Sequence, residues 1–333
     1  MDKIATGSDV DRRDLFSESA SRLSMNPVIV EKDFWVCWIL KKIFAEPTLQ
    51  GHLVFKGGTS LSKVYGLIDR FSEDIDLILD WRLLGYGTEQ GNDPCDVTAS
   101  KTKQSRANQE MNAKATAYIR ETLLGQLNRR LALAPGIAVS IDAADPHTLN
   151  VRYPAAFAAD YIRPEVRLEI GPLAAWIPSR SRTIQSYAAE AFPKAFENPT
   201  CTVVAIDAER TFWEKATILH QEAHRPGSVP SRYSRHYYDL CKLAGSPVKD
   251  SALSNLALLE DVVAFKERFY YSSWARYDLA KLGSFRLHPP EKQIPALARD
   301  YREMQDMFYR EPPEFSVVLH TLLALENEIN ALR

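Results

Sequence analysis

Apolar and polar positions follow helical spacing near the start of the chain. Asp11–Leu23 is polar with an amphipathic pattern, and a much more apolar run extends from Val28 to Ile43. Asn26 and Pro27 stand just before this run, where a cap and a proline at the first helical position are typical. The pattern therefore predicts two N-terminal helices.

The second of these helices carries an aromatic stripe formed by Phe34, Trp35 and Trp38. A stripe at helical spacing favours the core, against the sheet that follows. Stacking on a nucleic-acid base is the alternative. Glu31 and Lys32 lie on the same helix, and we expect them on a solvated face, with a turn toward a functional site as the alternative.

The spacing changes after the second helix. Leu53–Phe55 is a short apolar strand, a helical turn begins at Thr59, and a second strand carries Asp74 and Asp76 at alternate positions. Two or three further strands are predicted over Ile137–Ile141, Thr148–Tyr153 and Glu165–Ile170. These segments together predict a small mixed sheet.

A long helix is predicted from about Ala99 to Leu133. Its apolar face consists of Ala115, Ile119, Leu123, Leu127 and Leu131. Its other face is basic and contains Lys101, Lys103, Arg106, Lys114, Arg120, Arg129 and Arg130. A charged face is usually solvated. Contact with an RNA backbone is the alternative, because clustered Lys and Arg bind phosphate independently of sequence.

Prolines punctuate residues 172–199, which we interpret as the connection to a second, mostly helical unit. Helices are predicted there over residues 205–223, 253–265, 294–308 and 315–332. Between them, an aromatic cluster favours a core position, with stacking on exposed bases as the alternative. That cluster consists of Tyr270, Tyr271, Trp274 and Tyr277. The fold class is therefore α+β: a small mixed sheet flanked by helices in residues 1–190, and a mostly helical part in residues 191–333.

Composition sets limits on this picture. The 333 residues contain 25% charged and 45% hydrophobic residues, and the net charge is −2. Any nucleic acid must therefore meet a local basic patch. The four cysteines form no Cys-x-x-Cys pair, which argues against a zinc site and a disulfide framework. No apolar stretch approaches the roughly 18 residues of a membrane span. We expect a reduced, cytoplasmic protein with no membrane partner.

Two carboxylates and two glycines indicate chemistry on phosphate. Asp74 and Asp76 are two positions apart on a strand, so their side chains share one face. Mg²⁺ takes one or two protein carboxylates together with phosphate oxygens. Gly57 and Gly58 precede a helix whose free backbone N–H groups can meet phosphate. The combination predicts metal-assisted chemistry on a nucleoside triphosphate (NTP).

The residues around these groups also resemble a known family. Residues 56–63, Lys-Gly-Gly-Thr-Ser-Leu-Ser-Lys, and residues 70–77, Arg-Phe-Ser-Glu-Asp-Ile-Asp-Leu, resemble the signature of the DNA polymerase beta nucleotidyltransferase superfamily. Within it they are most similar to the AbiEii nucleotidyltransferase toxins, which include the MenT toxins. The gap from Gly58 to Asp74 is a few residues longer than usual, and we expect the helix from Thr59 to absorb it.

The resemblance implies a nucleotidyltransferase sheet and a metal, Mg²⁺ or alternatively Mn²⁺, held by Asp74 and Asp76. It also implies a set of residues that contact the nucleotide: Gly57, Gly58, Thr59, Ser60, Lys63, Arg70, Ser72 and Arg235.

A later motif, residues 209–215, resembles the AbiEii motif whose helical lysine is assigned to the triphosphate of the nucleotide. Lys215 matches that lysine. Considered without the resemblance, a lysine on a helix is expected to be solvated, and its neighbours Thr211 and Leu219 offer no ion pair. The resemblance favours the catalytic interpretation.

A further motif, residues 232–240, resembles the AbiEii motif whose aspartate belongs to the active site, either as a base or by positioning Arg and Lys side chains. Asp239 matches that aspartate. Arg235 stands one helical turn before it, so a helix-stabilising pair between the two is the alternative. His236 is expected to be structural or solvent-facing.

A third catalytic carboxylate is predicted on the strand Glu165–Ile170, where charged and apolar residues alternate. The superfamily often places such a group a few strands after the paired aspartates, to bind metal or to accept the proton of the attacking hydroxyl. Glu169 is the first candidate and Glu165 the second. A solvent-facing Glu-Arg pair on an edge strand is the alternative.

The resemblance implies an Mg²⁺-dependent toxin that transfers a nucleoside monophosphate (NMP) from an NTP to the 3′ end of tRNA and so blocks translation. It also implies a cognate antitoxin and a role in phage defence. A protein or small-molecule hydroxyl as acceptor remains an alternative. So does a catalytically idle scaffold that binds nucleotide or antitoxin, although such a scaffold needs neither the two aspartates nor Lys215.

Overall fold

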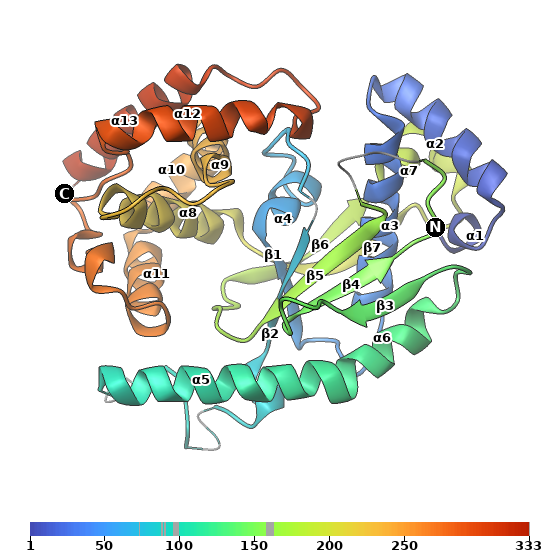
Figure 1. Cartoon of the computed structure of the whole chain (residues 1–333), viewed down its shortest axis with the longest axis horizontal. Helices are drawn as coiled ribbons and strands as arrows, with labels where there is room; N and C mark the ends of the chain where they lie inside the picture. The colour runs from blue at the N-terminus through green and yellow to red at the C-terminus, as the bar shows by residue number, and fades with distance from the viewer. Residues whose placement is uncertain (73, 88, 90, 96–99, 158–162, 333) are drawn as a thin grey trace. The chain divides into compact units, whose positions relative to one another are not determined.

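The computed structural model describes the chain except for residues 73, 88, 90, 96–99, 158–162 and 333. Its residues form two compact units. Unit 1 consists of Met1–Val64, Phe71–Val97 and Arg106–Ile206 and contains every strand that the structure describes. Unit 2 consists of Tyr65–Arg70, Thr98–Ser105 and Asp207–Arg333 and is built from helices and connecting turns (Figure 1).

The strands of unit 1 form one seven-stranded sheet in the order β3-β4-β5-β2-β1-β7-β6 (Figure 1). Their bounds are β1 Leu53–Lys56, β2 Asp74–Leu79, β3 Ala138–Ile141, β4 Thr148–Arg152, β5 Glu165–Gly171, β6 Ser179–Gln185 and β7 Thr200–Ile206. The pairs β1–β7 and β2–β5 are parallel, and the other neighbours are antiparallel. The prediction of a mixed sheet flanked by helices, followed by a helical part, is confirmed.

Seven α-helices of the described residues belong to the part of the chain before β7. They are α1 Asp2–Ala5, α2 Asp9–Leu23, α3 Pro27–Phe44, α4 Gly57–Lys63, α5 Lys101–Tyr118, α6 Leu124–Leu131 and, later, α7 Tyr187–Ala191. Of these, α2, α3 and α4 begin within two residues of the predicted starts. The Ser8 side chain caps α2 and the Asn26 side chain caps α3, each by accepting a backbone N–H of the first turn. The two predicted N-terminal helices are therefore confirmed.

Helix α3 is a core element of unit 1. Phe34, Trp35 and Trp38 are fully buried, which confirms the core interpretation of the aromatic stripe. The solvated face predicted for Glu31 and Lys32 is wrong, because each is only 1% exposed. The Glu31 carboxylate accepts the backbone N–H groups of residues 156 and 157 at 2.7 and 3.3 Å, so a distant loop takes the place of water.

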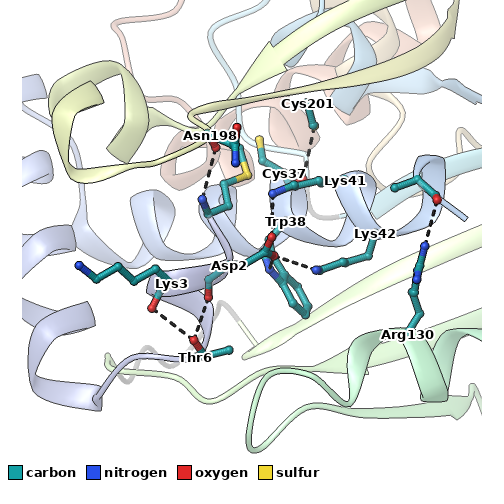
Figure 2. A network of polar contacts seen from close by, with 12 residues as sticks. Asp2, Lys3, Thr6, Cys37, Trp38, Lys41, Lys42, Arg130, Asn198 and Cys201 are labelled. Carbon is teal, nitrogen blue, oxygen red and sulfur yellow. Dashed lines mark hydrogen bonds and ion pairs between the residues drawn. The ribbon is translucent and has the colours of Figure 1, made fainter.

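A polar network joins α1 to α3. The Asp2 carboxylate accepts hydrogen bonds from Trp38 Nε1 and Lys41 Nζ, both at 2.9 Å, and lies 2.8 Å from Lys42 Nζ (Figure 2). Partial burial by itself would raise the pKa of Asp2, but the two ammonium groups outweigh it and hold that pKa below its usual range. The short first helix is thus fastened to the core by charge as well as by packing.

The predicted long helix is present as α5, a π-helical turn over Ile119–Leu123, and α6. All five apolar positions predicted to face inward are buried. The predicted start at Ala99 lies outside the described residues. On the basic face, Lys114 lies over the ring of Tyr86 and Arg130 pairs with Glu46, so these two cations already have protein partners.

The prediction that residues 172–199 are only a connection is wrong. They include β6 and α7, and β7 follows at once. The strand β6 was missed because its sequence, Ser-Arg-Ser-Arg-Thr-Ile-Gln, is polar at an edge of the sheet and lacks apolar alternation. Since β7 completes the sheet, unit 1 runs to Ile206 rather than to residue 190. The following helix begins at Ala208 instead of residue 205.

The helices of unit 2 are α8 Ala208–Ala223, α9 Ser234–Ala244, α10 Pro247–Leu253, α11 Leu256–Phe269, α12 Ile294–Glu303 and α13 Phe315–Ala331. The core position predicted for the aromatic cluster holds for Tyr277, which is buried, but is wrong for Tyr270 and Tyr271, which are 46% and 48% exposed. Among the described residues, no helix combines the length and the apolar content that a membrane span requires.

Candidate functional site

The turn between β1 and α4 brings a glycine against a carboxylate. Lys56, the last residue of β1, is registered opposite Asp76 of the antiparallel strand β2. Gly57 follows with a φ of +80°, and a Cβ atom built on it would lie 1.9 Å from Asp76 Oδ2. No residue with a side chain fits there without moving that carboxylate. The glycine turn and the Asp76 carboxylate therefore face each other.

Helix α4 is tied to the start of β2. The Thr59 hydroxyl donates a hydrogen bond to the backbone carbonyl of Asp74 and lies 3.4 Å from that of Ser72. Gly58, Thr59 and Ser60 are buried at the start of this helix. The structure therefore gives Thr59 a positioning contact. The nucleotide contacts predicted for Gly58, Thr59, Ser60 and Ser72 stay predictions.

Lys63, at the last turn of α4, is held in the interior. Its ammonium lies 2.8 Å from Asp33 Oδ1 and 3.8 Å from the centroid of the Tyr187 ring. Burial alone would lower the pKa of Lys63, but the Asp33 carboxylate raises it above its ordinary value. Asp33 also accepts the backbone N–H of Tyr187 at 2.7 Å. The ion pair fastens α4 to α3 and α7, and the predicted nucleotide contact of Lys63 stays a prediction.

The strand β5 lies beside β2, which is the position that a third carboxylate near Asp74 and Asp76 requires. The parallel register pairs Asp74 with Arg167 and Asp76 with Glu169. Arg167 Nε lies 3.6 Å from Asp74 Oδ1, and Arg167 Nη2 lies 3.6 Å from Glu169 Oε1. Glu165 is two positions before Arg167 and pairs with Arg163 at 3.8 Å. The register therefore favours Glu169 over Glu165 as the carboxylate next to the paired aspartates.

The donor set on β2 suits a hard divalent cation. Asp74 and Asp76 occupy alternate positions of β2 and are both half-buried. Two carboxylates with room for substrate oxygens match what Mg²⁺ takes from proteins. Over the part of the chain that the structure describes, no group of three or more His, Cys, Asp or Glu side chains is arranged to hold a metal ion. Asp74 and Asp76 are the side chains whose chemistry suits such an ion, and the metal predicted at them stays a prediction.

A second cluster of predicted residues lies in unit 2, around Asp239. This carboxylate is fully buried and accepts two hydrogen bonds from Arg70, Nε to Oδ1 at 2.7 Å and Nη2 to Oδ2 at 2.8 Å. Lys215 Nζ lies 2.9 Å from Oδ2. Burial alone would raise the pKa of Asp239, but the two cations outweigh it and hold that pKa well below its usual range. Asp239 thus orients one guanidinium and one ammonium.

Arg235 does not form the ion pair with Asp239 that its helical spacing offered as an alternative. Among the described residues, no ion pair joins Arg235 to Asp239, whose cationic partners are Arg70 and Lys215. The alternative of a helix-stabilising pair is therefore wrong. Arg235 is half-buried, and its charge lowers the pKa of both Lys215 and His236. Its predicted contact with nucleotide stays a prediction.

Lys215 is buried, contrary to the solvated position expected without the resemblance. Its side chain is 9% exposed, and its Nζ lies 3.0 Å from His236 Nδ1 as well as next to Asp239. Burial lowers the pKa of Lys215, and the Asp239 carboxylate opposes that change. His236 was not predicted as a neighbour of the lysine. Its position three residues before Asp239, on the same helical face, was the available signal.

The start of α9 depends on a second residue that was not predicted, Asp300. The Asp300 carboxylate on α12 accepts the backbone N–H of Ser234 at 2.8 Å, the Ser234 hydroxyl and the backbone N–H of Arg232. The Ser234 N–H belongs to the first turn of the helix that carries Asp239, where backbone donors have no acceptor within the helix. Nothing local in the sequence connects Asp300 with that helix, because the contact spans 66 residues.

Comparison with known proteins gives a family and a related structure. Residues 38–321 match the family model described as nucleotidyl transferase AbiEii toxin of a type IV toxin–antitoxin system. Among solved structures, the chain is similar to MenT4, a nucleotidyltransferase toxin from Mycobacterium tuberculosis, with 18% sequence identity and a TM-score of 0.43. That match covers 96% of this chain and 99% of the other. No curated protein matches the chain.

Proposed function

Because the chain belongs to the AbiEii family of nucleotidyl transferase toxins, we propose that it transfers NMP from an NTP to the 3′ hydroxyl of tRNA. Translation then stops, since an extended tRNA is not charged. The observation that carries the proposal is the Asp76 carboxylate lying against Gly57, with Asp74 two positions away on the same strand. Family membership alone does not require these contacts, whereas the proposed chemistry does.

The residues of unit 1 have distinct roles in this proposal. Asp74 and Asp76 hold Mg²⁺, or Mn²⁺ in its place. When bound, the ion supplies Lewis-acid stabilisation of charge on phosphate oxygens. The backbone N–H groups at Gly57 and Gly58, together with the Ser60 hydroxyl, bind the β and γ phosphates. Thr59 keeps this turn in register with Asp74.

The residues of unit 2 act on the negative charge of the triphosphate. Lys215 neutralises charge on the phosphates, and Arg70 and Arg235 add positive potential. Asp239 is the group that keeps Arg70 and Lys215 oriented. Positioning and charge stabilisation are the main contributions of protein groups to phosphoryl-type transfer.

The transfer step is an in-line displacement. The acceptor hydroxyl oxygen attacks the α-phosphorus of the NTP, a new O–P bond forms, and the bond from the α-phosphorus to the bridging oxygen of the β-phosphate breaks. Pyrophosphate leaves with the electron pair of that bond. The Glu169 carboxylate, registered beside Asp76, accepts the proton of the attacking hydroxyl.

Exposed cations on α5 and α6 support RNA as the acceptor. Lys101, Lys103, Arg106, Arg120 and Arg129 are exposed, and clustered Lys and Arg give sequence-independent affinity for an RNA backbone. The proposed substrates, NTP and tRNA, place the reaction in the cytoplasm. We further propose a cognate antitoxin as partner and a role in phage defence, because the family model describes toxins of toxin–antitoxin systems.

The decisive experiment incubates the purified protein and Mg²⁺ with each α-labelled NTP, together with total tRNA or lysate, and resolves the products on a gel. The test variant carries Asp74→Ala and Asp76→Ala. A matched control removes two exposed acidic groups of α2, Asp14→Ala and Glu18→Ala. We expect label on tRNA with wild type and control, and none with the test variant. Circular dichroism checks that all three proteins are folded.

Other outcomes separate the alternatives. Label on protein favours a protein hydroxyl as acceptor, and no label with any NTP favours an idle scaffold. Undiminished transfer by the Asp74→Ala/Asp76→Ala variant refutes the proposed chemistry. Transfer that persists in excess EDTA refutes the assigned role of the divalent ion.

A further inference from the structure

The Lys215 ammonium is held by two acceptors that differ in charge. Asp239 Oδ2 lies 2.9 Å from Nζ, and His236 Nδ1 lies 3.0 Å from it. An ammonium has three N–H donors. Both acceptors come from α9, whereas the lysine comes from α8. One N–H therefore remains after Asp239 and His236 have each taken one.

The two acceptors are themselves held in place. Asp239 is fixed by the paired hydrogen bonds from Arg70 at 2.7 and 2.8 Å. The His236 ring packs edge-on against Tyr233, with ring centroids 5.0 Å apart and an interplanar angle of 76°. His236 and Asp239 are three residues apart on one helix, so their side chains share a face. Lys215 consequently meets a preformed pair of acceptors.

His236 has the form that can accept this hydrogen bond. Burial of the ring lowers the pKa of His236 well below its usual range, and the Lys215 ammonium lowers it further. The neutral ring places its proton on Nε2 when Nδ1 accepts from Lys215. A neutral acceptor orients an N–H of the ammonium without neutralising the positive charge of the lysine. An ammonium held by carboxylates alone would lose more of its attraction for phosphate.

We propose that His236 is a positioning residue for Lys215: its Nδ1 fixes the rotation of the ammonium, so that the remaining N–H is presented to the triphosphate of the NTP. The charge of Asp239 keeps Lys215 in place, and the hydrogen bond to His236 fixes the direction of the remaining N–H. The identity of the ligand rests on the proposed function. The hydrogen bond between Lys215 and His236 does not.

The test compares three substitutions at His236. Asn places its amide oxygen near the position of Nδ1, Gln places it near Nε2, and Leu removes the acceptor. Lys215→Ala is the reference for complete loss of the ammonium, and His320→Leu, at an exposed histidine of α13, is the control. Binding of inorganic triphosphate with Mg²⁺ is measured by calorimetry on the full chain. KM and kcat are then measured with the NTP that wild type uses best.

We expect His236→Leu and His236→Gln to weaken triphosphate binding and raise KM by about tenfold, the scale of one hydrogen bond to a charged group. His236→Asn should remain within about threefold of wild type, since its oxygen replaces Nδ1. If His236 had only a structural role, the Asn and Gln variants would not differ in KM while having similar kcat. If His236→Leu fails to fold, the Asn and Gln variants still decide the outcome.

Equal affinity of the Asn and Gln variants for triphosphate overturns the inference. So does wild-type affinity in His236→Leu when Lys215→Ala has lost it. Wild-type affinity in Lys215→Ala itself also overturns it, because the ammonium would then not contact the triphosphate. Failure of the proposed function looks different: wild type binds triphosphate and the variants behave as expected, but no acceptor receives label.

Discussion

Replacing Gly57 by alanine tests the contact on which the proposed active site depends. The substitution has two costs. Alanine at a φ of +80° adopts the left-handed region, which costs about 1–2 kcal/mol of stability. The new Cβ would also lie 1.9 Å from Asp76 Oδ2 and 3.1 Å from Asp76 Cβ. The whole Asp76 side chain, and not only its tip, is therefore in the way.

The displacement can be converted into an expected loss of activity. To reach ordinary van der Waals contact, the Asp76 carboxylate must retreat by about 1.5 Å. Misplacing a reacting group by about 1 Å can cost about 100-fold in rate. We therefore expect Gly57→Ala to lower kcat for NMP transfer by about 100-fold or more. The free energy of unfolding should fall by about 1–2 kcal/mol for the backbone and by about 1–3 kcal/mol more for the crowding of Asp76.

Gly51 provides a matched control in the same unit. Its φ is +79°, but a Cβ built on it meets nothing within 4 Å. Gly51→Ala therefore carries the same backbone cost without the contact with Asp76. The assay measures kcat by transfer of labelled NMP, and stability by urea unfolding. If Gly57→Ala and Gly51→Ala have similar kcat, the carboxylate is not confined by this turn and the reasoning fails.

Three further predictions concern buried polar groups. Lys63→Met leaves the Asp33 carboxylate buried without its cation, so we expect a loss of about 3–5 kcal/mol in urea unfolding, partly recovered in the Asp33→Leu/Lys63→Met variant. His220 has a pKa lowered by burial from 6.5 to about 4, so its neutral form stabilises the fold above pH 6.5. That contribution, about 3 kcal/mol, is lost as the pH falls from 6.5 toward 4, and His220→Phe should flatten this part of the stability curve. Asp300→Ala removes the acceptor of the Ser234 N–H at the start of α9, so we expect a loss of about 1 kcal/mol in urea unfolding and a raised KM for NTP.

Each of these predictions has a result that contradicts it. A Lys63→Met protein as stable as wild type would show that Asp33 is not left charged in the core. An unchanged pH dependence in His220→Phe would assign the acid sensitivity to other groups. Asp300→Ala with wild-type KM and stability would show that α9 does not depend on this cap, and Asp300→Asn, which keeps one acceptor oxygen, should lose less than Asp300→Ala.

Much of the fold could be predicted because its signals are local. The caps at Ser8 and Asn26 and the apolar stripe of α3 lie within a few residues of the structure they determine. The edge strand β6 could not be predicted in this way, since its pairing with β7 and not its own pattern makes it a strand. Charged residues were misjudged for the same reason. Glu31 is buried because residues 156 and 157 donate to it from far along the chain.

In the candidate site, too, the features set by nearby residues could be predicted and those set by distant residues could not. Asp74, Asp76 and Gly57 were predicted together, because strand alternation and a glycine turn are short-range features. For Asp239 the family motif implied the positioning of Arg and Lys side chains but did not identify them. Arg235, which is close in the chain, is not the partner, and Arg70, which is, lies 169 residues away. Lys215 was recognised by its motif, but its burial beside His236 was not.

The sequence by itself determined which chemistry the chain can offer: a carboxylate pair on one face of a strand, a glycine turn before a helix, and a helical lysine in a family motif. Only the tertiary structure decided how these groups are held, with Asp76 against Gly57 and Lys215 between Asp239 and His236. The physical reason is that periodicity is set by the nearest residues of the chain. The burial and pairing of charges are set by whichever distant segments replace water around them.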